Sequence, residues 1–142
     1  MKRLVFILSV LVLAGVAYFA AEYDRTISFN ELPPAAQQIL NANFQGNKPI
    51  FITADWDDYK VVLSGGQKME FDRNGNWTDI ECGFTGVPEA LLPAPILTHI
   101  SQSFPGAQVS SISADWQGYD VELNTGLEIE YDKNFQVSKI DD

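Results

Sequence analysis

An internal repeat is the feature that most constrains the fold of this chain. The tripeptide Ala54-Asp55-Trp56 recurs as Ala114-Asp115-Trp116, and Glu70-Phe71-Asp72 recurs at the same offset of 60 positions as Glu130-Tyr131-Asp132. Because one offset serves both matches without a gap, the pattern indicates two copies of one structural unit. We place the two repeats at residues 27–82 and 87–142, and short linkers at residues 22–26 and 83–86.

Each repeat is expected to begin with a short helix. Prolines stand at the start of both segments, where a missing backbone N–H costs no hydrogen bond. Apolar residues then recur at i, i+4 and i+8, which places them on one face of a helix. They are Ala36, Leu40 and Phe44 in the first repeat, and Ile96, Ile100 and Phe104 in the second.

The remainder of each repeat is expected to form four short antiparallel strands. Residues 59–63 and 68–71, and their counterparts 119–123 and 128–131, alternate apolar and polar side chains, as half-buried strands do. One unit of roughly 55 residues buries little core, so the two sheets should be continuous or tightly packed. The predicted class is α+β: two tandem helix–four-strand repeats, forming an antiparallel sheet with both helices packed on one face.

A hydrophobic segment precedes the repeats. Lys2 and Arg3 are followed by an uncharged, predominantly apolar run from Leu4 to Ala21. This arrangement is typical of a secretory signal, and the run also just reaches the length of a membrane anchor. We interpret residues 1–21 as a signal peptide or an N-terminal anchor. In both cases the rest of the chain is exported, and the protein is periplasmic or secreted.

Composition and net charge exclude several classes of partner and of functional site. The 142 residues include 9 Lys+Arg and 19 Asp+Glu, a formal net charge of −10, which argues against nucleic acid and against membrane contact beyond the N-terminal segment. One Cys excludes an internal disulfide, and His99 has no nucleophile and acid at triad spacing. We therefore predict no catalytic residues, no metal site and no cofactor. Cys82 is expected to be buried and inert, with intermolecular pairing as the alternative.

One turn carries calcium-like spacing. Asp72, Asn74 and Asn76 offer side-chain oxygens at alternate positions, as calcium loops do. Gly75 comes too early for an EF-hand loop, and the second repeat has Phe135 in its place. An Asx-type hairpin turn is the better interpretation.

The doubled Ala-Asp-Trp…Tyr-x-Val-x-Leu pattern and the doubled Glu-aromatic-Asp-x-Asn turn, behind an export segment, resemble the PepSY-like family, which is compared with β-lactamase inhibitor protein. The resemblance covers residues 27–142. It implies a tandem helix-plus-sheet unit, an exported location and no enzymatic activity. PepSY domains at large are associated with the inhibition or regulation of peptidases. The family supplies no catalytic or ligand residues for this chain.

The candidate contact residues are acids and tryptophans. Strand alternation places Asp120, Glu122, Glu128 and Glu130 together on the sheet face opposite the helices. Such a face serves solvation or docks a basic partner. Trp56, Trp77 and Trp116 are either core residues or anchors on a binding surface.

The sequence thus leads to the hypothesis of a non-enzymatic exported protein-binding module. Its partner would be an unidentified envelope or secreted protein, and inhibition or regulation of a peptidase is the candidate role. The alternative is a periplasmic protein that binds a small ligand or a cation through the acidic sheet face.

Overall fold

The computed structural model describes residues 24–142. The segment interpreted as a signal peptide or anchor, residues 1–21, lies outside the described residues. Within residues 24–142, no helix is long and apolar enough to cross a membrane.

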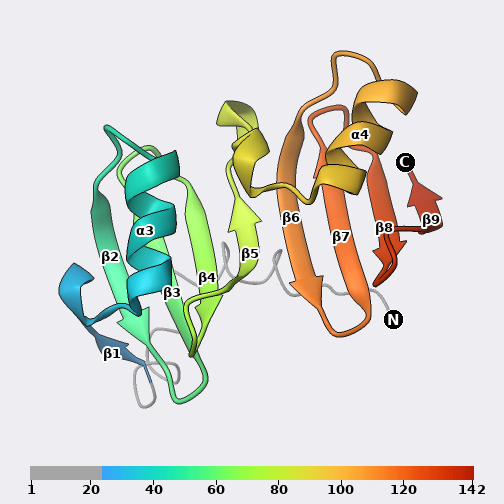
Figure 1. Cartoon of the computed structure of the whole chain (residues 1–142). Helices are drawn as coiled ribbons and strands as arrows, with labels where there is room; N and C mark the ends of the chain where they lie inside the picture. The colour runs from blue at the N-terminus through green and yellow to red at the C-terminus, as the bar shows by residue number, and fades with distance from the viewer. Residues whose placement is uncertain (1–23) are drawn as a thin grey trace.

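Within residues 24–142, two α-helices and nine antiparallel strands make up the fold, which confirms the predicted α+β class (Figure 1). The strands form one sheet in which the spatial order is the order along the chain, β1 to β9. Figure 1 shows α3 in front of the strands of the first half and α4 in front of those of the second half. The elements are β1 (Arg25–Thr26), α3 (Pro34–Asn43), β2 (Pro49–Ala54), β3 (Asp58–Leu63), β4 (Lys68–Asp72), β5 (Trp77–Glu81), α4 (Ala94–Ser103), β6 (Val109–Asp115), β7 (Gly118–Leu123), β8 (Glu128–Asp132) and β9 (Val137–Asp141), with short 3-10 turns η2 (Phe29–Glu31), η3 (Gly83–Thr85) and η4 (Glu89–Leu91).

Both helices depend on their packing against the sheet. Each has 10 residues, a length at which an isolated helix is marginal in water. Ala36 and Leu40 of α3, and Ile96 and Ile100 of α4, are buried in one cluster with the inward-facing strand residues. The predicted apolar stripe is therefore the face by which each helix joins the core.

The two halves share their irregularities as well as their strands. The register shifts between Pro49 and Phe51 where β2 meets β3, and between Val109 and Ser111 where β6 meets β7. The turn after β4 is the Asx turn expected from the sequence, because Asp72 Oδ1 accepts hydrogen bonds from the backbone N–H groups of Asn74 and Asn76, at 2.9 and 3.0 Å.

The halves join through direct pairing of β5 with β6. Ile80 lies opposite Ile112, and both are buried, at 0% and 1% exposure. The neighbouring Cys82 N–H donates to the Ser110 carbonyl at 2.9 Å. Cys82 is a free, buried cysteine, and burial raises the pKa of its thiol to about 11, which keeps it protonated. The two repeats therefore share one continuous sheet.

A short strand occupies part of the region expected to be a linker. β1 pairs with β2, and the Ile27 N–H continues the pairing by donating to the Ile52 carbonyl at 3.0 Å. Two paired residues show no periodicity in a sequence, so this strand was missed.

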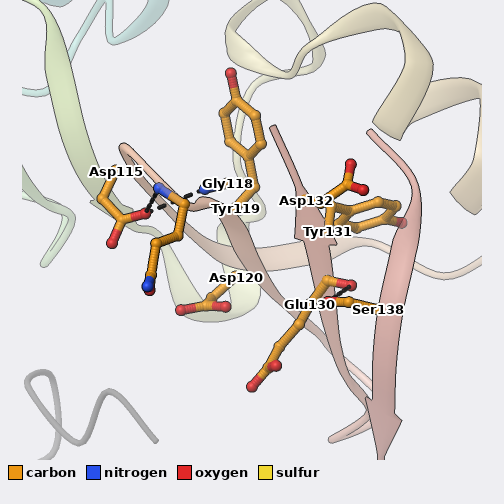
Figure 2. A pocket seen from close by; sticks show the side chains of 9 residues that line it. Asp115, Gly118, Tyr119, Asp120, Glu130, Tyr131, Asp132 and Ser138 are labelled. Carbon is orange, nitrogen blue, oxygen red and sulfur yellow. Dashed lines mark hydrogen bonds between the residues drawn. The ribbon is translucent and has the colours of Figure 1, made fainter. Parts of the chain in front are cut away.

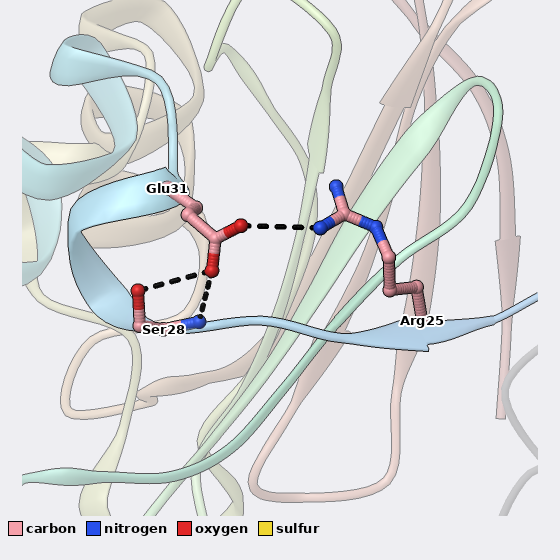
Figure 3. Close-up of polar contacts among 3 residues, drawn as sticks. All are labelled: Arg25, Ser28 and Glu31. Carbon is pink, nitrogen blue, oxygen red and sulfur yellow. Dashed lines mark hydrogen bonds and ion pairs between the residues drawn. The ribbon is translucent and has the colours of Figure 1, made fainter.

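Side-chain hydrogen bonds fasten the chain just after β1 (Figure 3). Glu31 Oε2 accepts hydrogen bonds from the Ser28 backbone N–H at 2.8 Å and from the Ser28 hydroxyl at 3.0 Å, and Arg25 Nη1 donates to Glu31 Oε1 at 3.1 Å. The hydrogen bonds from Ser28, followed by the contact with Arg25, lower the pKa of Glu31. These contacts tie η2 to the end of β1.

The repeat supplies a matched test of the β5–β6 junction. We expect Ile80→Ala to lower the free energy of unfolding by about 2–5 kcal/mol, because it leaves a cavity between the halves. Its counterpart Ile140→Ala, at a position 47% exposed, should cost less than about 1 kcal/mol. Urea denaturation in dilute solution measures both changes, and equal losses would contradict this account of the junction.

Candidate functional site

The candidate site is the sheet face whose side chains alternate with the core residues. Along β7, for example, Asp120 and Glu122 alternate with Val121 and Leu123, which are buried. Acids of β4, β5, β7, β8 and β9 occupy this face. We use the name acidic face for those that precede the turns at Asp72 and Asp132 or lie on the neighbouring strands: Glu70, Asp79, Glu81, Asp120, Glu122, Glu128, Glu130 and Asp141. The four acids predicted from the sequence are among them.

Strand register places several of these acids directly opposite one another. Asp120 lies opposite Glu130, and Glu122 lies opposite Glu128. In the first half, Glu70 lies opposite Asp79. Like charges at opposed positions of an antiparallel pair destabilise a sheet. The acidic face therefore carries an electrostatic cost that the core pattern does not require.

Lysines occur at the flanks of the acidic face. Lys60 lies opposite Glu70, Lys68 opposite Glu81, and Lys139 opposite Glu130. Between the two halves, Ser111 and Ser113 of β6 separate the acids of β5 from those of β7. The middle of the face thus presents acids and hydroxyl groups.

Burial, with the neighbouring acids as a second cause, raises the pKa of two carboxyls on this face. Burial, followed by the hydrogen bond and the charge of Asp79, raises the pKa of Glu70 to about 7, against the opposing effect of Lys60. Burial and the charges of Glu128 and Glu81 raise the pKa of Glu122. Each raised pKa means that this site on the sheet disfavours the ionised form of the carboxyl relative to water.

A shallow polar depression lies beside the turn that joins β6 to β7. The residues that line it come from the turn and from β7, β8 and β9: Asp115, Gln117, Gly118, Tyr119, Asp120, Glu130, Tyr131, Asp132 and Ser138. Figure 2 shows Asp120 of β7 and Glu130 of β8 on the opposite side of the sheet from the ring of Tyr119. Asp115 Oδ1 closes the turn by accepting hydrogen bonds from the backbone N–H groups of Gln117 and Gly118, at 2.7 and 3.1 Å.

The three tryptophans have different surroundings. Trp56 and Trp116 are 78% and 82% exposed, in hairpin turns at the same end of the sheet, which corrects the core interpretation of both (Figure 1). Trp77 is half-buried and packs against the core. A register shift at Glu70/Phe71 causes this placement, because it sets Trp77 opposite the fully buried Phe71.

A cluster of three carboxylates lies in the turn between β2 and β3. Ligand oxygens of Asp55, Asp57 and Asp58 all lie within 4.8 Å of one another. Burial raises the pKa of Asp58; Lys60 opposes this shift, and nearby acids add to it. These three acids were not among the predicted site residues, although three acids within four positions are a signal that the sequence carries. The corresponding turn of the second repeat keeps only Asp115, with Gln117 and Gly118 in place of the other two acids.

His99 makes structural contacts. Its Nδ1 lies 2.7 Å from the Tyr131 hydroxyl, and its ring meets Phe104 edge-on, with 6.0 Å between the ring centroids. Burial raises the pKa of Tyr131 to about 12. This arrangement ties α4 to β8 and agrees with the expected half-buried helix position.

The Glu70–Asp79 pair predicts a specific pH dependence. Because the pKa of Glu70 is about 7 in the folded protein against its usual 4.5, this group stabilises the fold fully below about pH 4.5, and the contribution is lost as the pH rises through 7. We expect Glu70→Gln to reduce the fall in unfolding free energy between pH 4.5 and pH 8.

Denaturant melts at the two pH values measure this effect. Glu130→Gln is the matched control, since its carboxyl occupies the equivalent position of the second half, opposite Asp120 and Lys139, as Glu70 lies opposite Asp79 and Lys60. If Glu70→Gln kept the full fall seen in the wild type, the assignment to this pair would be wrong.

Comparisons with known proteins point to one family. The family model described as "putative beta-lactamase-inhibitor-like, PepSY-like" matches the chain twice, over residues 21–64 and 57–139. No curated protein is similar enough to this chain to count as a relative.

Solved structures from Bacteroides resemble the chain over most of its length. A "putative periplasmic protein" from Bacteroides vulgatus is 36% identical, with a TM-score of 0.80, and the match covers 84% of this chain and 97% of that one. A "putative calcium-regulated periplasmic protein" from Bacteroides thetaiotaomicron is 32% identical, with a TM-score of 0.82, and the coverage is 87% and 99%. A "putative periplasmic protein of unknown function" from B. vulgatus is 28% identical, with a TM-score of 0.78 and coverage of 84% and 99%. None of these descriptions names an enzymatic activity.

Proposed function

Because the chain belongs to the PepSY-like family, we propose that it is a non-enzymatic periplasmic binding protein, whose acidic face docks a basic region of another envelope or secreted protein. Inhibition or regulation of a peptidase is the role that fits such a partner. The observation that carries the proposal is the set of like-charged pairs on the acidic face, above all Asp120 with Glu130 and Glu122 with Glu128.

A basic partner would relieve a repulsion that the free protein bears. Solvation of a sheet face needs polar side chains, but it does not need acids at directly opposed positions. Lysine or arginine side chains laid across these pairs would offset the like-charge cost. Complementary charge of this kind acts mainly on association rate and on the choice of partner.

Trp56 and Trp116 are the proposed aromatic anchors beside the acidic face. Both lie in turns at one end of the sheet, and both expose most of their surface. Trp and Tyr dominate the binding energy of many protein interfaces. Trp77 is left out of this surface because its ring packs against the core.

Capture from envelope extract tests the proposal with two variants of equal charge. The face variant combines Glu122→Gln, Glu128→Gln and Glu130→Gln. The control variant combines Glu31→Gln, Glu89→Gln and Asp142→Asn, which are exposed acids away from these pairs. Bound proteins are identified by mass spectrometry, and the affinity of each purified partner is then measured at low and at physiological salt.

We expect a partner that binds the wild type and the control variant but binds the face variant at least about tenfold more weakly. Loss of three exposed charge contacts at up to about 1 kcal/mol each corresponds to that range. A partner that binds all three proteins equally would overturn docking through the acidic face, and loss of that binding in Trp56→Ala or Trp116→Ala would then locate the site at the turns.

Calcium binding is a second candidate function, at the Asp55–Asp57–Asp58 turn. A relative 32% identical to this chain is described as calcium-regulated. In this chain, the spacing of the three carboxylates, within 4.8 Å, matches oxygens on opposite sides of a calcium ion bound at about 2.4 Å. Within residues 24–142, Asp58 Oδ1 is buried and has no hydrogen-bond donor, so a cation would satisfy it.

Thermal melts at constant ionic strength test this candidate. With calcium at ten times a millimolar Kd, binding to the folded state adds about 1.4 kcal/mol and raises Tm by a few degrees. Asp57→Asn should abolish the rise, and Glu89→Gln should keep it. The candidate fails if magnesium or added NaCl produces the same rise, or if Asp57→Asn retains it.

A further inference from the structure

β9 is an unprotected sheet edge. In the sheet formed by residues 24–142, β1 covers part of the outer edge of β2, whereas β9 pairs with β8 alone. The outer backbone N–H and C=O groups of an edge strand are a template for another strand. Figure 1 shows β9 at the end of the sheet farthest from β1.

Comparison of β9 with β5, its counterpart in the first half, shows that β9 lacks an outer neighbour among the described strands. Ile140 of β9 corresponds to Ile80 of β5, and both face a core residue on the inner neighbour: Ile80 lies opposite Met69, and Ile140 lies opposite Ile129. Ile80 is fully buried, because Ile112 of β6 lies on its other side. Ile140 is 47% exposed and has no such neighbour among the described strands. The last strand of each half thus differs in its surroundings: β5 has an outer partner, β6, whereas β9 has none among the described strands.

We propose that a second copy of this chain covers the edge, through antiparallel pairing of β9 with the partner's β9 about a two-fold axis at Ile140. Opposed residues of an antiparallel pair share a face. Ile140 would then lie opposite the partner's Ile140 on the core face, as Ile80 lies opposite Ile112 inside the chain. Residues 139–141 would pair across the axis, the same number of register pairs as the β5–β6 junction has.

Charge selects this register. With the axis at Ile140, Lys139 lies opposite the partner's Asp141 and Asp141 opposite the partner's Lys139, which gives two reciprocal ion pairs. An axis at Lys139 would instead place the two lysines opposite each other, which is unfavourable. Lys139 and Asp141 already form an ion pair within β9, Nζ to Oδ2 at 2.5 Å, with both side chains 44% exposed, so their charges are in place for exchange across the axis.

The pairing would also relieve the acidic face at this edge. Asp141 lies opposite Glu128 on its inner side, which sets two like charges at opposed positions. In the proposed dimer the partner's Lys139 would lie on the outer side of Asp141. The interface is self-complementary, as a closed two-fold dimer requires. It would join two acidic faces into one surface, and it does not depend on the proposed function.

Cysteine cross-linking tests the register in the protein as purified from the envelope. The only native cysteine, Cys82, is buried. We expect Ile140→Cys to form an intermolecular disulfide under mild oxidation, because the two thiols would be directly opposed. Ser138→Cys is the matched control. In this register it is about 13 Å from its own copy along the strand, beyond disulfide reach.

Sedimentation of charge variants provides the second readout. Lys139→Asp and Asp141→Lys should each weaken the dimer at least tenfold, since each places like charges opposite twice, and the double exchange should restore it. Lys133→Asp, in the β8–β9 turn, carries the charge change of Lys139→Asp and should leave the dimer intact. A wild type that stays monomeric at high concentration, equal cross-linking by Ser138→Cys, or single variants without effect would each overturn the proposal, as would an envelope peptide found on β9 of a monomer.

Discussion

The pairing of β5 with β6 is the contact on which the rest of the structure depends. Within residues 24–142, the first half has one short helix and five strands, one of them only two residues long, and the second half has one short helix and four strands. Either half alone is too small to bury a substantial core. The Ile80–Ile112 contact places both halves in a single sheet, and one core cluster then runs through them. It also brings the acids of β5 beside the serines of β6 and the acids of β7, so it creates the middle of the acidic face.

The two repeats agree on one face of the sheet and differ on the other. On the core face, the repeats keep the same apolar positions, because packing tolerates little change in volume. On the other face they diverge: Lys60 and Lys68 in the first half correspond to Asp120 and Glu128 in the second. A face free of packing constraints is free to acquire charge. The result is a set of opposed acids that costs stability. Burial, together with the opposed Asp79, raises the pKa of Glu70 to about 7. A family without a named enzymatic activity and a face of this kind are consistent with a binding role.

Alternation and helical spacing were reliable guides where the backbone is regular. The stripe of Ala36 and Leu40, the strands around Val61 and Val121, and the Asx turn at Asp72 were all predicted. Prediction failed where regularity is broken or where neighbours decide the outcome. β1 is too short to have a period. The register shift that turns Trp77 toward the core has no sequence signal. For Trp56 and Trp116 the sequence left a core position and an exposed anchor open, and the structure exposes both.

The sequence by itself determined the α+β class, the element order within each repeat and which side of each strand is apolar, because these follow from local spacing along the chain. Only the tertiary structure decided that the halves form one sheet, that Asp79 and Glu81 join the acidic face, and that β9 is left as a free edge while β1 covers β2. Strand neighbours and register result from contacts between residues far apart in the chain. A spacing pattern states which face a residue occupies, but not which residue lies opposite it. Ile80 and Ile140 occupy the same position of the repeat, yet one is the centre of the core and the other a free edge.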